Sequence, residues 1–323
     1  MSATVTVTAL PSTVVEPASL HLIAGDTKKE EYPALQPFEH VDAGSRALHH
    51  PNPRSFLANS NVVEMTPEFG LDVRGCNLAE LNPDQKDQLA LEVARRGVVV
   101  FREQQDFIDR GAGFYTEWAR HFGPLHVHPT SGHPEGHHEV HLVYKDAKSK
   151  FKTDSITSTL WHSDCSFELQ PAGLTTFFLL AQPKTGGDTL YSSQVLNFRS
   201  LSPIMQDFFA HAQSDAHGHW QFALEAGWYA LYVNKQFTRR IVGMKVEESE
   251  LLLNFLYDHI AKSNDHQVRI KWEPMTMVLW DNRITAHTAT YDYSHMKVLR
   301  HGARISAQAE RPIPALSTMK MED

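Results

Sequence analysis

Cysteine is scarce in this chain of 323 residues, which contains only Cys76 and Cys165. Two thiols cannot build the disulfide framework of a small secreted domain, so the sequence predicts a reducing compartment and a cytoplasmic location. Long apolar runs are also lacking: none approaches the roughly 18 residues that a membrane helix needs. The N-terminal residues do not follow the pattern of a secretory signal. We therefore expect no membrane partner.

A basic excess is missing as well. Lysine and arginine together number 30 against 38 acidic residues, which gives a net charge of −8. Proteins that bind nucleic acids usually carry a basic surplus, so we expect no nucleic-acid partner. A local basic pocket for a small anion remains compatible with this balance. The hydrophobic content of 41% is that of a globular protein with a sizeable core.

The composition divides the chain into two parts. Residues 1–60 are rich in Pro, Ser and Thr, and we interpret them as an N-terminal extension that wraps the domain or is partly irregular. Residues 61–323 contain neither an internal repeat nor a linker. This second part is therefore expected to form one domain, for which its length is sufficient.

Helix and strand signals alternate along the second part. Helices are expected at 82–97, at 111–122, from 202 onward and at 247–262, the first with Asn82 as N-cap and Pro83 in the first turn. Strands are expected at 97–101, 138–144, 174–182, 188–193, 239–244, 267–272, 275–280 and 300–308. Because several later strands have no long helix between them, mostly antiparallel pairing is expected. The predicted fold is mostly β with flanking α: a double-stranded β-helix, or jelly roll, with outer helices.

The stretch WHSDCSFEL (161–169) places His162 two residues before Asp164. Residues i and i+2 of a strand share a face, so the two side chains could reach one metal ion. Alone, the pair fits a polar strand edge better, because His-x-Asp often occurs by chance. His287, in LWDNRITAHTAT, is a candidate third ligand. Two histidines and one carboxylate form the facial triad that holds Fe(II) with open positions.

Arg300 and Arg304 follow His287 in the stretch RHGARISAQ. On a strand these two side chains share a face, and their small and apolar neighbours suggest that the strand is half-buried. Two buried guanidinium groups need anionic partners, and arginine binds carboxylates and similar oxyanions through a fixed fork of donors. The alternative is a pair of surface arginines on an exposed strand.

Taken in order, WHSD, PKTGGDTLYSS, LWDNRITAHTAT and RHGAR resemble the taurine/sulfonate dioxygenase family of Fe(II)- and 2-oxoglutarate-dependent enzymes. The resemblance runs from about Phe69 to Pro312. HSDCSFELQPAG and the sequence AERP make the chain most similar to the fungal-type sulfonate dioxygenases. The resemblance implies a jelly-roll fold, Fe(II) as the metal, and 2-oxoglutarate and O2 as co-substrates.

The resemblance also implies roles for individual residues. His162, Asp164 and His287 match the catalytic iron ligands of the family. Thr189 and Arg300 match the residues that bind the distal carboxylate of 2-oxoglutarate. Arg304 matches the arginine that holds the substrate sulfonate, and His128 matches a histidine that contacts the substrate. Trp161 matches an aromatic residue beside the first iron ligand.

The implied reaction is hydroxylation of a C–H bond of a small anionic molecule, an organosulfonate in the leading hypothesis, with release of succinate and CO2. One alternative is the same chemistry on another small molecule of fungal secondary metabolism. Another is a non-catalytic jelly-roll protein that binds metal, although such a protein has no use for Thr189 and Arg300. Related enzymes are commonly dimers or tetramers, so the resemblance allows a homo-oligomer.

Three features have no assigned role in this reaction. The histidine-rich segment 126–141 is interpreted as a polar loop rather than a second metal site, because no Cys or carboxylate set accompanies it at zinc-like spacing. Cys165 is interpreted as a small buried residue. The segment 217–237, with Trp220, Phe222, Trp228 and Tyr229, is either a lid over the substrate or a packing or dimer contact.

Overall fold

The computed structural model describes residues 36–129, 131–146, 148–149, 160–211, 214–215, 221–223, 228–296 and 298–311. Within the N-terminal segment, two short 3₁₀ helices, η1 (Ala43–Ala47) and η2 (Ser55–Leu57), pack against helix α1 (Pro83–Arg96). Ala43, Phe56 and Leu57 are buried in the same cluster as the apolar face of α1. Residues 36–60 thus contribute to the core, and residues 1–35 lie outside the described part of the chain.

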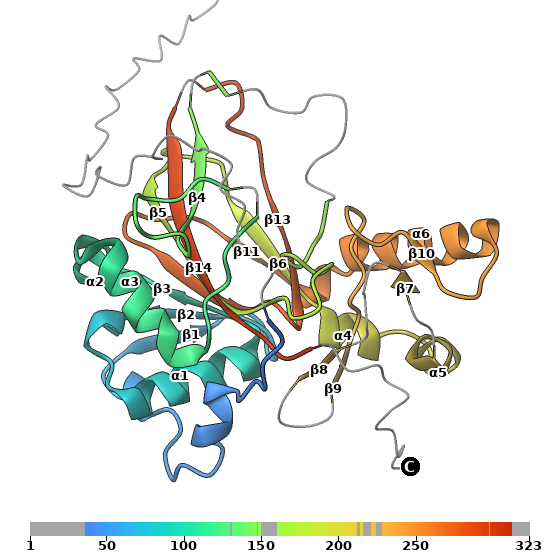
Figure 1. The fold of residues 1–323 in the computed structure, drawn as a ribbon, viewed down its shortest axis with the longest axis horizontal. Coiled ribbons are helices and arrows are strands. Elements are labelled where there is room, and N and C mark those ends of the chain that lie inside the picture. The colour runs from blue at the N-terminus through green and yellow to red at the C-terminus, as the bar shows by residue number, and fades with distance from the viewer. Residues whose placement is uncertain are drawn as a thin grey trace, which may run out of the picture.

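Two sheets form the centre of the molecule (Figure 1). The larger has the order β1-β2-β3-β12-β5-β14-β4, and the smaller has the order β11-β6-β13. The strands of the larger sheet are β1 (Asn61–Glu64), β2 (Leu71–Arg74), β3 (Val98–Phe101), β12 (Met277–Asp281), β5 (Ala172–Ala181), β14 (Arg300–Gln308) and β4 (His141–Lys145). Those of the smaller are β11 (Gln267–Ile270), β6 (Thr189–Ser193) and β13 (Thr285–Ala289). Among the described strands only β2 and β3 pair in parallel, and the prediction of a mostly antiparallel jelly roll with outer helices is confirmed.

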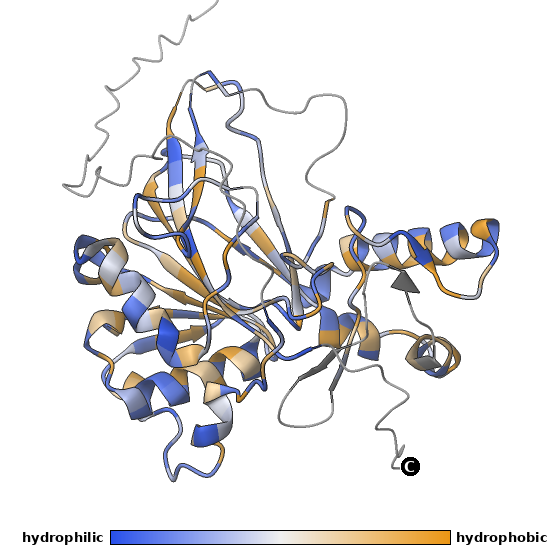
Figure 2. Cartoon of the chain, viewed as in Figure 1, coloured by the Kyte–Doolittle hydropathy of each residue, from blue (hydrophilic) through white to orange (hydrophobic). Residues whose placement is uncertain are grey.

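The central strands β3, β12, β5 and β14 of the larger sheet are buried on both faces, and alternate residues supply the two faces. Residues that pack with the helices on the outer face include Val99, Phe101, Met277 and Leu279. Their sequence neighbours point the other way and pack with the smaller sheet. These neighbours include Val98, Val100, Val278 and Trp280. Figure 2 shows the central strands as strongly apolar. This two-sided burial explains why these strands are almost continuously hydrophobic in sequence.

Helices cover the sheets from two sides (Figure 1). Helices α1, α2 (Gln105–Asp109) and α3 (Gly111–Ala119) lie on the outer face of the larger sheet. Helices α4 (Gln194–Arg199), α5 (Pro203–His211) and α6 (Val246–Lys262) form a second group, packed around a separate apolar cluster. Helix α1 begins as predicted, with a capping box between Asn82 and Gln85, and ends at Gly97. No described helix is long and apolar enough to span a bilayer.

Several predicted boundaries were wrong. The helix expected at 111–122 is α-helical only to Ala119 and continues as a 3₁₀ turn. The strand expected at 138–144 begins at His141, because the residues before it form turns. The strand expected at 239–244 shrinks to β10 (Arg240–Ile241), since the chain turns at Gly243, whose φ is +84°. β10 pairs with β7 (Ser214–Asp215), and β8 (Gln221–Ala223) pairs with β9 (Trp228–Ala230).

A buried ion cluster ties the N-terminal segment to the sheets. The Arg283 guanidinium lies 2.9 Å from Asp42, 2.5 Å from Asp281 and 2.9 Å from Glu310. Burial alone would lower the pKa of Arg283, but the three carboxylates raise it well above its usual value. Asp42 precedes η1, Asp281 ends β12, and Glu310 follows β14. One cation therefore joins parts of the chain that are distant in sequence.

We expect Arg283→Met to lower the free energy of unfolding by about 3–5 kcal/mol, because it leaves buried carboxylates without their cation. Urea denaturation of the full chain measures this loss. Lys262→Met is the control, because Lys262 forms an exposed pair with Asp258 and its removal should cost about 0.5 kcal/mol or less. Equal losses in the two variants would contradict the role given to the cluster.

Candidate active site

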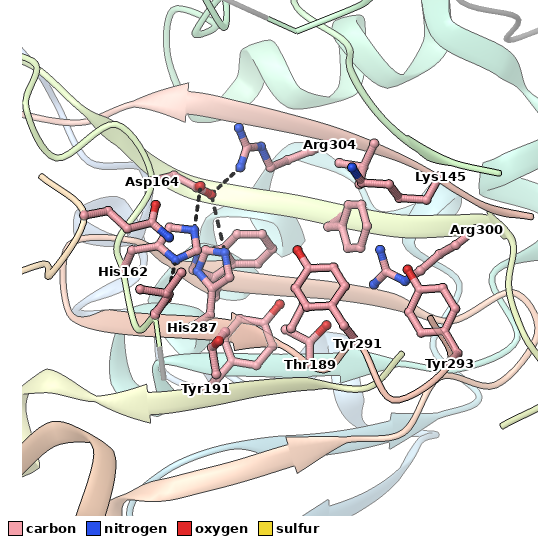
Figure 3. Close-up of a pocket in the computed structure, with 17 residues that line it drawn as sticks. Lys145, His162, Asp164, Thr189, Tyr191, His287, Tyr291, Tyr293, Arg300 and Arg304 are labelled. Atoms are coloured by element: carbon pink, nitrogen blue, oxygen red, sulfur yellow. Dashed lines mark hydrogen bonds and ion pairs between the residues drawn. The ribbon is translucent and has the colours of Figure 1, made fainter. Parts of the chain in front are cut away.

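A cavity of about 480 Å³ lies between the two sheets (Figure 3). Polar residues on its wall come from both sheets and from adjoining loops: Lys145, His162, Asp164, Thr189, Gln236, His287, Thr288, Arg300 and Arg304. Aromatic residues supply much of the remainder: Phe177, Tyr191, Trp280, Tyr291 and Tyr293. The predicted site residues therefore line one cavity, with the exception of His128, which is not part of its wall.

His162, Asp164 and His287 converge at one end of this cavity (Figure 3). One ligand atom from each lies within 4.8 Å of the other two, which is close enough for a single ion. The Asp164 carboxylate is 3.7 Å from Nε2 of His162 and 4.0 Å from Nε2 of His287. The backbones of the two histidines form an isolated antiparallel bridge, with N–H···O distances of 3.1 and 2.8 Å. This bridge brings residues from distant parts of the chain into register.

The expectation that His162 and Asp164 share a strand face was wrong. Only the bridge at His162 is extended, and the chain then turns. Cys165 has a φ of +50°, in the left-handed region, and its carbonyl accepts the Glu168 N–H at 2.9 Å. The strand periodicity fails here because a turn, rather than the pleat, directs Asp164 toward the cavity.

Asn282 holds this turn in place. Its side-chain oxygen accepts the Asp164 N–H at 2.7 Å, and its amide group donates to the Asp164 carbonyl at 2.9 Å. Asn234 acts similarly one residue earlier, where its side-chain oxygen accepts the Ser163 N–H at 2.6 Å. Both asparagines are buried. Sequence reasoning missed both, although Asn282 lies in the LWDNRITAHTAT motif.

The charge state of the three residues suits a divalent cation. Burial lowers the pKa of His287 to about 3, so its imidazole is neutral at pH 7. Burial would raise the pKa of Asp164, but Arg304 and the two histidines together hold it well below its usual value. Nδ1 of His162 lies 3.0 Å from the Leu160 carbonyl, which fits an Nδ1–H donor and leaves Nε2 as the ligand atom. Two imidazoles and one carboxylate form a donor set typical of Fe(II).

Arg300 lies at the other end of the cavity (Figure 3). It is buried, and its Nη2 donates to the Gly187 carbonyl at 3.4 Å, while its Nε has no hydrogen-bond partner among the described residues. Within the described residues no carboxylate pairs with it, and burial lowers its pKa. Thr189 is also on the cavity wall, with its hydroxyl oxygen accepting the Trp272 indole N–H at 3.1 Å. The hydroxyl proton can still be donated to a ligand.

Arg304 is four residues along the same strand, and its Nη1 lies 2.5 Å from Oδ2 of Asp164. The contact is an ion pair without hydrogen-bond geometry. His128, predicted to contact the substrate, instead packs its ring 4.4 Å from the His141 ring, and burial and Arg304 lower its pKa to about 4. Trp161 is buried in the apolar cluster of the second helix group and does not line the cavity.

The histidine-rich segment is not uniformly a solvated loop. His126 is buried, and the structure brings it beside Cys165 and Glu168. The expectation concerned zinc-like spacing along the sequence; in space, Cys165 and Glu168 lie beside His126. Cys165 is buried, as predicted.

Part of the aromatic segment 217–237 can be placed. Trp220 lies outside the described residues, as do the side chains of Phe222 and Trp228. Tyr229 packs against Phe198, with ring centroids 5.3 Å apart. Further along, Gln236 lines the cavity, and Phe237 packs near His162.

We expect Asn282→Ala to lower the affinity for Mn²⁺ at the triad by about 10- to 100-fold, because it releases the backbone that orients Asp164. Isothermal titration of the full chain with Mn²⁺ measures this change. Asn197→Ala is a matched control: Asn197 is equally buried, but it bonds to Ser192 and His266, outside the triad. A similar loss of affinity in both variants would argue against a positioning role for Asn282.

Comparison with known proteins agrees with this geometry. The sequence model of the family described as "Taurine catabolism dioxygenase TauD, TfdA family" matches residues 61–225 and 214–305. An alpha-ketoglutarate-dependent sulfonate dioxygenase of Saccharomyces cerevisiae is 38% identical, over 91% of this chain and 78% of that protein. The alpha-ketoglutarate-dependent dioxygenase cnsP of Penicillium expansum is 35% identical, over 94% of this chain and 93% of that protein.

A solved structure gives the same result. The crystal structure of a taurine dioxygenase from Burkholderia xenovorans superposes with a TM-score of 0.67 at 27% identity. The match covers 79% of this chain and 91% of that one. Sequence family, fold and donor set thus agree, and the chain belongs to the TauD/TfdA family as an Fe(II)/2-oxoglutarate-dependent dioxygenase.

Proposed function

We propose that this dioxygenase hydroxylates a carbon atom that bears a sulfonate group in a small organic anion. The observation that carries the proposal is the pair of buried arginines, Arg300 and Arg304, which face the triad's cavity from one strand. A single bound 2-oxoglutarate would need only one such cation at its distal carboxylate. The second arginine is then available for another anion, which is the substrate.

Three residues are proposed to hold the metal: His162, Asp164 and His287. When bound, Fe(II) with 2-oxoglutarate and O2 supplies the oxidising power that hydroxylates a C–H bond and releases succinate and CO2. The protein contributes position. Asn282 fixes the Asp164 turn, and the backbone bridge fixes the two histidines relative to each other.

Arg300 and Thr189 are proposed to bind the distal carboxylate of 2-oxoglutarate. A buried guanidinium without an anionic partner is unstable unless a ligand supplies the charge. Arg300 lies across the cavity from the triad, so a dicarboxylate could reach both ends (Figure 3). The Thr189 hydroxyl, held by Trp272, is placed to donate a second hydrogen bond.

Arg304 is proposed to bind the sulfonate. In this structure its charge is balanced by Asp164. A divalent cation at the triad would take over that balance, which leaves the Arg304 guanidinium with a positive charge for an anion beside the metal. Lys145, opposite Arg300 in the pairing of β4 with β14, adds a further cation to the cavity wall.

A second candidate substrate is a larger molecule of fungal secondary metabolism. The aromatic wall, which includes Tyr291 and Tyr293, favours a substrate with an apolar or ring-bearing body. The similarity to cnsP is nearly as high as that to the yeast sulfonate dioxygenase. Both candidates use the same triad and the same co-substrate, and they differ in whether Arg304 has a ligand.

We expect alkyl and arylalkyl sulfonates, which carry a C–H bond on the carbon that bears the sulfonate, to give substrate-dependent succinate together with an equal amount of sulfite. Hydroxylation of the carbon next to the sulfonate yields an adduct that splits into an aldehyde and sulfite, so the two products should match in amount. Arg304→Leu should lower kcat/KM for the sulfonate on the order of 10- to 100-fold, mainly through KM. Coupled assays of succinate and sulfite over a panel of sulfonates measure both effects.

The control for this panel is Arg74→Leu, because Arg74 pairs with Glu273 on the surface, away from the cavity. This variant should turn over sulfonates at the wild-type rate. The sulfonate assignment is overturned if no sulfonate releases sulfite while a neutral fungal metabolite gives succinate. The same holds if Arg304→Leu leaves sulfonate turnover unchanged.

We also expect anaerobic addition of Fe(II) and 2-oxoglutarate to produce a weak visible charge-transfer band. Arg300→Leu removes the cation for the distal carboxylate, so the 2-oxoglutarate concentration needed for half of the band should rise about 10-fold or more. Titration of the band with 2-oxoglutarate measures the shift. Arg304→Leu serves as the comparison, and an equal shift in both variants would contradict the separate roles given to the two arginines.

A further inference from the structure

A second group of metal-ligating side chains lies directly behind the turn that carries Asp164. It consists of His126, Cys165 and Glu168, and one ligand atom from each lies within 4.8 Å of the other two. His126 comes from the loop after the 3₁₀ turn Arg120–Phe122, and the other two come from the WHSDCSFEL stretch. None of the three belongs to the set proposed to hold iron. The proposed function gives this group no role.

The turn presents Cys165 and Glu168 on the same side. The Glu168 N–H donates to the Cys165 carbonyl at 2.9 Å, so the two residues are the ends of a tight turn. Cys165 has a φ of +50°, in the left-handed region that is unfavourable for a residue with a side chain. Glycine or asparagine would be the usual choice at such a position. Strained backbone of this kind tends to occur at functional sites.

His126 is fixed opposite this turn. Its backbone N–H donates to the Ser306 carbonyl at 2.9 Å, and the preceding Leu125 forms a bridge with Ala307. Both contacts anchor the loop to β14. The imidazole Nε2 lies 2.8 Å from a carboxylate oxygen of Glu168. The position of the ring is therefore set by β14 rather than by the histidine-rich loop itself.

Burial makes this group more than a surface cluster. His126 and Cys165 are each 4% exposed, whereas the Glu168 side chain is 21% exposed. A nitrogen and a sulfur ligand are thus enclosed, and the carboxylate lies at the edge toward solvent. Glu168 is therefore the ligand that an ion arriving from solvent meets first.

We propose that His126, Cys165 and Glu168 form a site for a borderline-soft divalent cation of the Zn²⁺ type. Zn²⁺ binds imidazole nitrogen, thiolate sulfur and carboxylate oxygen, and three protein ligands leave a fourth tetrahedral position for water. The ion ties the loop that holds His126 to the turn that holds Asp164. The sulfur ligand separates this site from the triad at His162, Asp164 and His287, which offers only nitrogen and oxygen.

The protonation balance of the site is simple. A divalent cation displaces the Cys165 thiol proton to solvent and binds the thiolate. No oxidant or reductant takes part.

Co²⁺ is the probe that tests the site, because thiolate ligation gives Co²⁺ an intense near-ultraviolet charge-transfer band that nitrogen and oxygen ligands do not give. The full chain is titrated with Co²⁺ without oxygen. We expect one equivalent to produce this band in the wild type and in Cys76→Ala, which removes the chain's other buried cysteine. Cys165→Ala should abolish the band, and Glu168→Gln should weaken binding about 10-fold or more.

His287→Ala breaks the triad and should leave the sulfur band intact, so failure at this site is distinguishable from failure of the proposed dioxygenase site. Unfolding curves recorded without metal check that Cys165→Ala is folded, and Cys165→Ser is the second variant if it is not. Absence of the band in the wild type overturns the proposal. Loss of the band in Cys76→Ala together with its retention in Cys165→Ala does so equally.

Discussion

The site depends on the strict alternation of side chains along β14. Arg300 and Arg304 face the cavity, whereas Ala303 and Ile305 point into the core beneath the helices. Gly302 lies between the two arginines, and a Cβ atom there would come within 2.7 Å of the Phe177 ring and of the Phe178 carbonyl. The close approach of β5 to β14 therefore requires glycine at this position. The Phe177 ring thus separates the guanidinium groups of Arg300 and Arg304, so each of them needs a separate anion.

Charge compensation then links the two halves of the cavity. Asp164 is one carboxylate amid two buried guanidinium groups and Lys145, so the protein alone leaves the cavity with a positive excess. Arg304 takes the Asp164 charge in this structure, and Arg300 has no anionic partner within the described residues. A divalent metal would increase that excess. A cavity of this kind is suited to binding dianionic 2-oxoglutarate first and a further anion second, since each ligand offsets charge that the fold has already buried.

The sequence predicts the fold well where periodicity and burial act together. The bounds of β14 agree with the predicted 300–308, and α1 begins and ends at its expected caps, because in both segments local preference and tertiary packing favour the same structure. It fails where a turn replaces the regular pattern. The chain around Asp164 is shaped by Asn282 and Asn234, which arrive from other elements, and no local pattern signals contacts over such distances.

The same reasoning explains which parts of the site could be found from sequence. The three proposed iron ligands, Thr189 and the arginines lie within short motifs whose order is recognisable. β13, which carries His287, was missed as a strand, yet its histidine was identified from the motif. Gln236, Tyr291 and Tyr293 line the cavity but have no motif, because a cavity wall is assembled from whichever side chains the loops bring to it. Substrate choice depends on such residues, so it is harder to predict from the sequence than the metal and the co-substrate are.

The turn after His162 carries two ligand sets back to back, and this follows from its geometry. Extended backbone would send Asp164 and Cys165 to opposite faces of a strand, with Glu168 on the same face as Asp164. The left-handed residue at Cys165 instead reverses the chain, so that Asp164 faces the cavity while Cys165 and Glu168 close on His126. One strained residue thus separates an oxygen-and-nitrogen donor set from one that contains sulfur. Metals that differ in softness would be sorted between the two sets by this difference in donors rather than by distance.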